Sequence, residues 1–443
     1  MTGRCPFSSR RGFLAAAGGL VAAAGTARAA PAGTDAARGI STAGQGQGKN
    51  LIEPFWGEHQ GGIATPLQNQ TFFAVFDLAA DKTADVVKLL RTWTDAAARM
   101  TQAQTAMPMG DNLGVPAGDS GEALGLGPAR LTLTFGLGPG LFVKDGKDRY
   151  GLGARRPAAL VDLPGFNGDQ LVQSHTGGDL SVQACADDPQ VAFHAVRQLA
   201  RLAYGAAQIR WVQTGFSANY AADETPRNLM GFKDGTQNPV SRPPLEQSAG
   251  QVKPNPGSLE DVVWVSDEGP DWMRGGSYLV VRRIRMALEH WDRMEVDFQE
   301  QVFGRQKYSG APLGEKNEFD PLDLDATDKD GNPIIPDTAH VRLAAAATND
   351  GAQILRRAYS YNDGVNFTAE RWPPWRQGLE YDAGLLFLCY QRDPRTGFIK
   401  IYENMSKLDM LNQFVTHTGS GVFACPGGVS EGGFIAQGLF DAV

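Results

Sequence analysis

The 443-residue chain contains little cysteine, which excludes the usual cysteine-based sites. Its 4 cysteines are Cys5, Cys185, Cys389 and Cys425. They form no C-x-x-C pair, no C-x-x-C-H motif for covalent haem and no zinc-site spacing. Cys185 and Cys389 lie in apolar runs and are predicted to be small core residues. One disulfide is allowed by the count but not required.

Histidine is scarce as well, with 6 in the chain. No H-x-H, no H-E-x-x-H and no facial pattern of histidines and a carboxylate occurs, which argues against copper oxidases, zinc hydrolases and non-haem iron enzymes. No G-x-S-x-G elbow, Walker loop or dinucleotide-binding fingerprint opens a βαβ unit either. With so few histidines, each can be weighed in turn as a ligand.

No apolar run is long enough to span a bilayer. The N-terminus instead has SRRGFL (residues 9–14), a short run rich in Ala and Gly, and then ARA (residues 27–29). This pattern predicts a cleaved signal peptide over residues 1–29, and the paired arginines are typical of the twin-arginine route for folded proteins. Residues 30–50 are predicted to be a flexible linker. We therefore expect a soluble mature protein in the periplasm, the cell envelope or the extracellular space.

Basic residues are outnumbered in this sequence. The chain has 41 Lys and Arg against 49 Asp and Glu, and its formal net charge is −8. Loss of residues 1–29 removes arginines and no acid, so the mature chain is still more acidic. Because an acidic chain without a basic stripe binds nucleic acid poorly, no nucleic-acid partner is expected.

What the chain does contain is a pattern that occurs twice. The first half has predicted strands at residues 71–78, 130–135, 180–185 and 209–212, and helices at 85–100 and 189–204. The second half has predicted strands at residues 277–285, 353–361 and 384–390, and helices at 288–303 and 405–416. Each half runs roughly strand–helix–strand twice, which is the ferredoxin-like order.

The repeated order predicts an α+β protein made of two ferredoxin-like halves with antiparallel sheets, similar to a dimeric α+β barrel. The two domains are placed at residues 51–222 and 223–443, with the boundary near residues 218–226. A polar insert at residues 315–336 is predicted to be a surface loop.

His340 differs from the other five histidines, which lie in helical runs or polar loops and are predicted to be structural. It stands in IPDTAHVRL (residues 335–343), where Pro336 and Asp337 indicate a helix start with Asp337 as N-cap. One neutral imidazole on a short, fixed element is what a five-coordinate haem iron needs. A structural role remains the alternative from these residues alone.

Two other segments carry candidate functional residues. GFKDGTQNP (residues 231–239) places Asp234 on a tight loop, where Gly235 lets the backbone approach a ligand; a plain surface turn is the alternative. QILRRAYSY (residues 353–361) is predicted to be a strand, so Arg356 and Arg357 point to opposite faces. An arginine among apolar neighbours needs a counter-anion or oxygen ligand, and alternation does not decide which arginine has one.

Together these three segments resemble the dye-decolourising peroxidase family. The matching pieces are GFKDG (231–235), HVRL (340–343) and LRRAYSY (355–361), in the family's order and at similar separations. The resemblance covers nearly the whole mature chain, and the twin-arginine signal is similar to that of the exported branch, which includes the deferrochelatases of bacterial iron uptake.

The resemblance implies a haem peroxidase that binds haem b non-covalently, mainly through its C-terminal half. His340 is then the proximal iron ligand, Asp234 the distal acid–base residue and Arg356 the distal cation. Gly235, Thr236 and Gln237 are expected to lie against the haem edge and propionates through backbone and side-chain contacts. Hydrogen peroxide and a small one-electron donor, such as a dye or a phenolic, are the implied substrates.

The chemistry implied for these residues is simple. Asp234 moves a proton between the two oxygens of peroxide, and Arg356 stabilises the charge on the departing oxygen. Asp297 or Glu300 is expected to accept a hydrogen bond from His340. Tyr359, Tyr361 and Tyr390 are candidates for carrying electrons from the donor.

Two alternative functions stay open, and the sequence departs from the family pattern at one place. The protein could release iron from haem, with iron-uptake proteins as partners, or it could be a ligand-binding module without redox chemistry. The stretch after HVRLA is Ala345–Ala347, where family members often carry a polar Asn-Pro-Arg-type segment, so haem contacts are not assigned there. The oligomeric state is not predicted.

Overall fold

The computed structural model describes residues 50–218, 224–239, 259–369 and 377–441. All of them belong to one compact unit, which runs from Ala43 to Val443. The predicted signal peptide at residues 1–29 lies outside the described residues, as does the predicted linker apart from its last residue. The predicted domain boundary falls partly on residues 219–223, which are also outside, and it stays a prediction.

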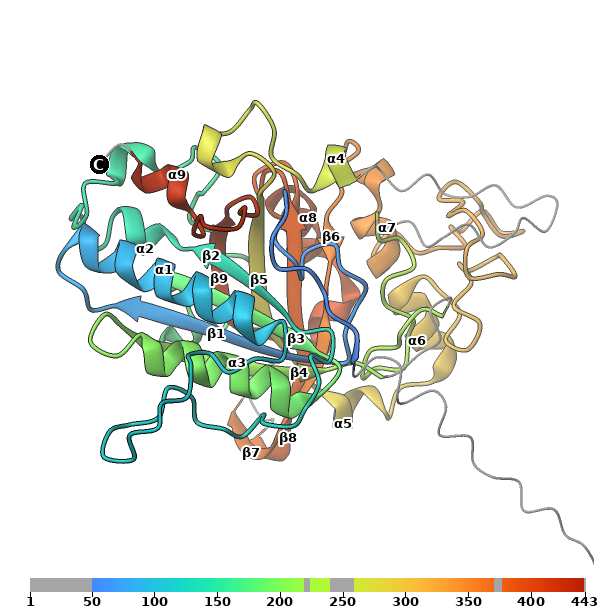
Figure 1. Ribbon diagram of the computed structural model, residues 1–443. Coiled ribbons are helices and arrows are strands. Elements are labelled where there is room, and N and C mark those ends of the chain that lie inside the picture. The colour runs from blue at the N-terminus through green and yellow to red at the C-terminus, as the bar shows by residue number, and fades with distance from the viewer. Residues whose placement is uncertain (1–49, 219–223, 240–258, 370–376, 442–443) are drawn as a thin grey trace, which may run out of the picture. The chain divides into compact units, whose positions relative to one another are not determined.

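The N-terminal half is a four-stranded antiparallel sheet with the two long helices α1 and α3 and the short helix α2 (Figure 1). Its main elements are β1 (Gln70–Leu78), α1 (Thr83–Met100), β2 (Thr132–Leu137), α2 (Pro139–Phe142), β3 (Leu180–Ala186), α3 (Pro189–Leu202) and β4 (Ala207–Phe216). The strand order is β2-β3-β1-β4. α1 buries Val86, Leu90, Trp93 and Ala97, which recur at helical spacing, and α3 lies beside it.

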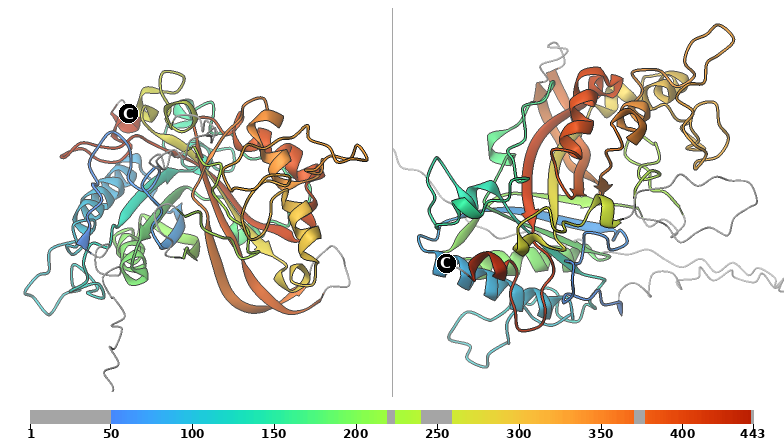
Figure 2. Two further views of the ribbon diagram at one scale, coloured as in Figure 1. Left: turned by 90° about the vertical axis from the view of Figure 1, so that its right-hand side faces the viewer. Right: turned by 90° about the horizontal axis from the view of Figure 1, so that it is seen from above.

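The C-terminal half repeats this plan. Its elements are α4 (Leu259–Val262), β5 (Ser277–Met286), α5 (Leu288–Trp291), α6 (Val296–Phe303), α7 (His340–Ala344), β6 (Leu355–Arg356), β7 (Tyr359–Ala369), β8 (Gln377–Gln391), α8 (Phe398–Leu408), β9 (Val415–Cys425) and α9 (Gln437–Phe440). Figure 2 shows β7 and β8 running together as a long hairpin. The order β9-β5-β8-β7 matches that of the first half, which confirms two ferredoxin-like halves.

The two sheets join into one closed sheet. Leu137 on β2 pairs with Ala424 on β9, and Phe216 on β4 pairs with Ser360 on β7. The pairing of β5 with β8 completes the ring of strands. A core cluster takes members from β1, β3, β4, β5, β7, β8 and β9, including Phe73 and Tyr390. The described part of the fold is therefore held by side chains that meet inside this closed sheet.

Cys185, Cys389 and Cys425 are all buried and free. Cys185 and Cys389 are core residues, as predicted, and none of the three described cysteines forms the disulfide that their number allowed. Burial raises the pKa of the Cys389 and Cys425 thiols well above the ordinary value.

Three predicted elements were wrong in detail. The helix predicted at residues 405–416 is α8, which ends at Leu408, and β9 starts at Val415. The reason is Asp409, whose carboxylate accepts the Leu411 N–H and starts a separate 3₁₀ turn. The helix at 288–303 is split into α5 and α6, and the strand at 353–361 is split into β6 and β7.

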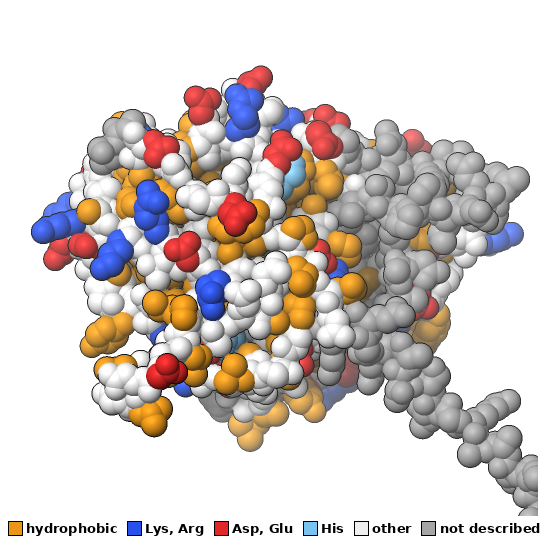
Figure 3. Space-filling view, viewed as in Figure 1, with side chains coloured by type: hydrophobic (Ala, Val, Ile, Leu, Met, Phe, Trp, Pro, Cys, Tyr) orange, Lys and Arg blue, Asp and Glu red, His pale blue; other side chains and the backbone are white. Residues whose placement is uncertain are grey.

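The surface shown in Figure 3 carries charges of both signs. On this face, Lys and Arg side chains of the described residues stand apart among acidic and apolar ones and form no stripe. Within the described ranges, no helix combines the length and the hydrophobicity needed to cross a membrane.

Candidate active site

A cavity of about 430 Å³ lies in the C-terminal half. Its described lining residues fall between Asn228 and His417. All six residues singled out in the sequence line it: Asp234, Gly235, Thr236, Gln237, His340 and Arg356. Much of the remaining wall is apolar, with Met230, Phe232, Met286, Phe303, Leu385 and Phe387 among its members. The size and the mainly apolar wall are typical of a pocket for a large organic ligand.

His340 opens the short helix α7 at the cavity wall. Its Nδ1 donates to Asp409 Oδ2 over 2.7 Å, and the Asp409 side chain is only 3% exposed. This bond fixes the proton on Nδ1 and leaves Nε2 with the lone pair that binds a metal. Asp337 is not the N-cap as predicted: Ala339 holds that position, and the Asp337 carboxylate is exposed near Arg342.

The expected partners of His340 were wrong. Glu300 Oε1 accepts the Lys307 N–H, and Asp297 accepts from Gln301 on the exposed face of α6. Asp409 is 69 residues from His340 in the chain and lies inside a segment predicted as helix, so no sequence pattern pointed to it.

His417 is the second histidine of the cavity wall, and it lies in β9 rather than in the predicted loop. Arg282 Nε donates to its Nδ1 over 2.9 Å, and its Nε2 is 2.8 Å from the Tyr402 hydroxyl. Burial and then the charge of Arg282 lower the pKa of His417 well below its ordinary value, so the ring is neutral. Because both ring nitrogens have partners, His340 is the better candidate for an iron ligand.

Asp234 and Arg356 meet directly in the cavity wall. Arg356 Nη1 donates to Asp234 Oδ1 over 2.6 Å. The Asn238 side chain ties their two segments together, since it donates to the Arg356 carbonyl at 2.7 Å and accepts the Arg356 N–H at 2.9 Å. Gly231 has a φ of +87° and Gly235 a φ of +125°, conformations that favour glycine and that make the tight loop around Asp234.

The two neighbouring arginines separate as strand alternation predicts. Arg356 lines the cavity. Arg357 is 4% exposed and donates to the Thr65 carbonyl and to Gln68 Oε1 instead. Arg356 is therefore the arginine available to a ligand in the cavity.

Arg305 is a cavity residue that no sequence pattern singled out. It is 5% exposed, and its Nη1 donates to the carbonyls of Gly310 and Glu318. Its Nη2 is buried without a hydrogen bond to any described residue. Burial, together with the nearby Arg356 charge, lowers the pKa of Arg305 to about 10.

The donor set of the cavity fits haem. An imidazole with one free nitrogen suits the iron, an apolar wall suits the macrocycle, and an unpaired guanidinium N–H suits a haem carboxylate. The Thr236 hydroxyl donates to Glu318, so it is not available as a donor to a carboxylate. Ala345, Ala346 and Ala347, which were left unassigned, also line the cavity.

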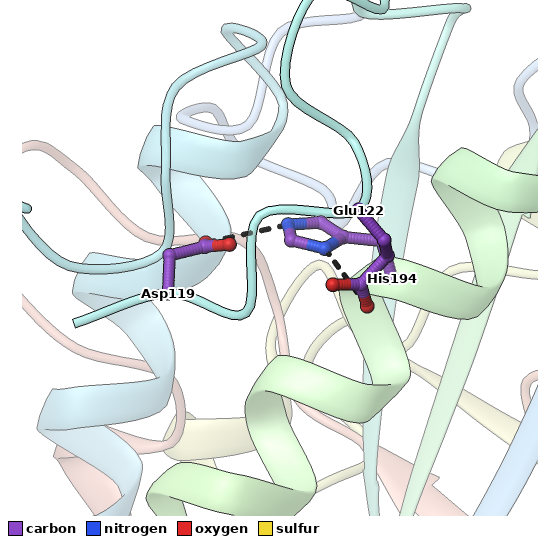
Figure 4. Close-up of side chains that lie close together, drawn as sticks. All are labelled: Asp119, Glu122 and His194. Atoms are coloured by element: carbon purple, nitrogen blue, oxygen red, sulfur yellow. Dashed lines mark ion pairs between the residues drawn. The ribbon is translucent and has the colours of Figure 1, made fainter. Parts of the chain in front are cut away.

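A second group of ionisable side chains lies in the N-terminal half (Figure 4). His194 on α3 has Nε2 at 3.4 Å from Asp119 Oδ2 and Nδ1 at 3.2 Å from Glu122 Oε1. Each ring nitrogen faces a different carboxylate, so the ring lies between the two acids. The group therefore connects the loop of Asp119 and Glu122 to α3.

Comparison with known proteins places this geometry in a family. The model of the Dyp-type peroxidase N-terminal region matches residues 60–217, and that of the C-terminal region matches residues 225–430. The dye-decolorizing peroxidase of Thermobifida fusca (strain YX) is 39% identical over 86% of this chain and 84% of its own length. The deferrochelatase of Escherichia coli (strain K12) is 36% identical over 86% of both chains.

Solved structures agree with this assignment. Ferric DtpA from Streptomyces lividans is 39% identical with a TM-score of 0.75, over 88% of this chain and 97% of that chain. A variant of DypB from Rhodococcus jostii, solved in complex with haem, is 20% identical with a TM-score of 0.57 over 86% of this chain and 97% of that chain, and shares the fold. The chain described here therefore belongs to the Dyp-type peroxidase family and is a haem peroxidase of that type.

Proposed function

We propose that the cavity binds haem b non-covalently and that His340, through Nε2, would hold its iron. The observation that carries this proposal is the 2.7 Å hydrogen bond from His340 Nδ1 to the buried Asp409, in the wall of the cavity that also holds Asp234 and Arg356. When bound, haem supplies the iron at which peroxide is reduced. The unpaired N–H of Arg305 supports a contact with a haem carboxylate.

Asp409 is assigned the role of strengthening His340 as a ligand. A carboxylate that accepts the Nδ1 proton orients the ring and makes its other nitrogen more basic. The low exposure of Asp409 supports this role, because little water competes for the bond.

Asp234 and Arg356 are assigned the chemistry of peroxide. Asp234 Oδ1 accepts a hydrogen bond from Arg356. We therefore assign proton transfer to Asp234 Oδ2, which takes a proton from one peroxide oxygen and delivers it to the other. The oxygen that receives the proton leaves as water, and the Arg356 guanidinium stabilises its negative charge as the O–O bond breaks. Two molecules of a small one-electron donor, such as a dye or a phenolic, then supply the two electrons that peroxide reduction requires. With two protons these electrons convert the second peroxide oxygen to water and return the enzyme to its starting state.

Peroxide kinetics of the haem-loaded protein test this assignment. We expect Asp234→Asn to slow the reaction with hydrogen peroxide by about 100-fold or more, the usual contribution of a general acid–base residue. Arg356→Leu should slow the same step, whereas His340→Ala should reduce haem binding in a titration of the Soret band. An unchanged peroxide rate in the Asp234→Asn, Arg356→Leu double variant would contradict the assignment.

Release of iron from haem is the second candidate function, with iron-uptake proteins as partners. The similarity to the Escherichia coli deferrochelatase, at 36% identity, favours it. The product of incubation with haem distinguishes the two functions: metal-free protoporphyrin supports iron release, and unchanged haem opposes it.

Export by the twin-arginine route, with a periplasmic, envelope or extracellular location, is also part of the proposal. The SRRGFL segment and the ARA site support it. Replacing Arg10 and Arg11 by lysine should retain the protein in the cytoplasm, as fractionation would show, and normal export of this variant would exclude the route.

A further inference from the structure

Glu318 lies in the polar loop at residues 315–336, which the sequence predicted to be only a surface feature. Its side chain is 9% exposed. Its carboxylate accepts hydrogen bonds from three side chains, namely Thr225 Oγ1, Lys233 Nζ and Thr236 Oγ1, the last at 3.0 Å. All three donors belong to the segment that carries Asp234, so one buried carboxylate binds this segment at three points.

The backbone around Asp234 depends on such contacts. Gly231 and Gly235 bracket the residue, and both have positive φ values. Glycine fixes its own backbone least, so contacts with other residues hold the loop in place. The Asp234 N–H donates to the Pro226 carbonyl at 2.8 Å, and side-chain bonds add to this backbone contact. Asn238 ties one end of the loop to Arg356, and Glu318 holds the residues on both sides of Asp234.

Charge gives Glu318 a second role. Lys233 precedes Asp234 in the chain, and both line the cavity. In the structure the Lys233 ammonium pairs with Glu318, although Asp234 is the next residue in the chain. Burial alone raises the pKa of Glu318, but the bonds from Lys233, Thr225 and Thr236 outweigh it and lower the pKa, so Glu318 remains charged.

We propose that Glu318 is a positioning residue for Asp234: it fixes the loop and keeps the Lys233 ammonium away from the Asp234 carboxylate. Asp234 is then left to pair with Arg356 and to exchange a proton with peroxide. The inference rests on the proposed role of Asp234.

A charge-removal test separates positioning from simple support of the fold. In Glu318→Gln, the carboxamide cannot pair with Lys233, so the ammonium is free to pair with Asp234. An opposite charge beside a carboxylate stabilises its ionised form, which shifts the ionisation of Asp234 to lower pH. Removing that ammonium in the Lys233→Met, Glu318→Gln double variant should reverse this shift, whereas a fold defect would persist.

The experiment uses the haem-loaded full chain and hydrogen peroxide as the probe. Stopped-flow rates across pH, haem affinity, and hydrogen exchange of residues 224–239 are measured for each variant. We expect Glu318→Gln to slow the peroxide step by about tenfold or more, within the range of general acid–base effects, and to move its pH profile to lower pH. The double variant should recover most of the rate and the original pH profile. Exchange should be faster in both variants, and haem affinity should be unchanged in Glu318→Gln.

Two reference variants make the outcomes distinct. Glu315→Gln removes an acid from the same loop and should match the unmodified protein. Asp234→Asn reports on the proposed function itself: if it leaves the peroxide rate unchanged, the role of Asp234 is wrong. If Asp234→Asn is slow but Glu318→Gln is normal, or if the double variant is as slow as Glu318→Gln, the positioning role is overturned.

A conservative variant covers the case in which Glu318→Gln does not take up haem. Glu318→Asp keeps the charge beside Lys233 but shortens the reach to the two threonines. We expect faster exchange of residues 224–239 with an unmoved pH profile. A moved pH profile, or unchanged exchange, would overturn the inference.

Discussion

Replacing Asp409 by asparagine changes the hydrogen bonding of His340 while it preserves the shape of the side chain. Asp409 uses both oxygens: Oδ1 accepts the Leu411 N–H at 2.8 Å, and Oδ2 accepts from His340 Nδ1 at 2.7 Å. An amide has only one oxygen. If it stays on Leu411, the NH₂ group faces His340 Nδ1 and favours the tautomer with the proton on Nε2, the nitrogen needed for iron. If it turns to His340, two N–H donors face each other at Leu411.

Either arrangement leaves one buried group without its proper partner. Such a loss costs about 1–3 kcal/mol. In the first arrangement the cost falls on haem binding and corresponds to a haem dissociation constant raised by roughly 5- to 150-fold. In the second it falls on the stability of the fold. Asp409→Ala, by contrast, imposes no tautomer on His340. We therefore expect Asp409→Asn to bind haem more weakly than Asp409→Ala, although asparagine is the closer relative of aspartate.

Titration of the haem-free protein with haem, followed at the Soret band, measures the effect. Glu403→Gln is the matched control, because Glu403 lies on α8, the helix that ends just before Asp409, in an exposed pair with Lys407, and its replacement should leave haem affinity unchanged. Thermal unfolding of the haem-free variants separates a loss of the turn at Leu411 from a loss of ligation. The tautomer argument would be refuted if the haem affinity of Asp409→Asn equalled that of the unmodified protein. It would also be refuted if that affinity exceeded the affinity of Asp409→Ala.

Two other predictions concern Arg305 and Glu122. Arg305→Met should weaken haem binding by roughly 10- to 150-fold, since a hydrogen bond to a charged group contributes about 1.5–3 kcal/mol, but it should not weaken binding of the haem dimethyl ester. Equal losses for both porphyrins would exclude a carboxylate contact. For Glu122, burial raises the pKa, but bonds from Ser120, its own backbone and His194 lower it to about 2 from 4.5. A carboxyl group whose pKa is lower in the folded than in the unfolded protein stabilises the fold at pH values above its unfolded pKa. The unmodified protein should therefore exceed Glu122→Gln in unfolding free energy by a constant amount above pH 4.5, and by less as the pH falls towards 2. Denaturant titrations at several pH values measure this difference. A difference that does not change with pH would contradict this.

The sequence predicted most of the fold because the deciding signals are local. β1 and β5 have dense apolar runs, and α1 and α3 have apolar residues at helical spacing, so their positions follow from short windows. The final helix failed because the segment around Asp409 is apolar enough to continue as helix, and a single side-chain bond to Leu411 ends it. Whether the helix continues or ends here depends on one side-chain hydrogen bond, and such a bond leaves no periodic pattern in the sequence.

The candidate site likewise has residues that the sequence could predict and residues that it could not. His340, Asp234 and Arg356 lie in segments with recognisable residue patterns, and the structure brings all three to one cavity. Asp409 and Arg305 could not be found in this way. Asp409 meets His340 through a contact between α7 and the end of α8, and Arg305 is set apart by its burial and its unpaired Nη2. Such properties depend on the tertiary structure.

Arg356 and Arg357 show how closely the proposed active site and the contacts that hold the fold lie together in this chain. A single peptide bond separates a guanidinium that faces the cavity from one that is buried against Thr65 and Gln68. In a mutational survey, both positions would score as intolerant, but for unrelated reasons. Loss of Arg356 is expected to leave a folded, haem-loaded protein that reacts slowly with peroxide, whereas loss of Arg357 is expected to leave little folded protein to isolate. Neighbouring intolerant positions in this segment therefore do not outline an active site, and expression yield is the measurement that assigns each one to chemistry or to folding.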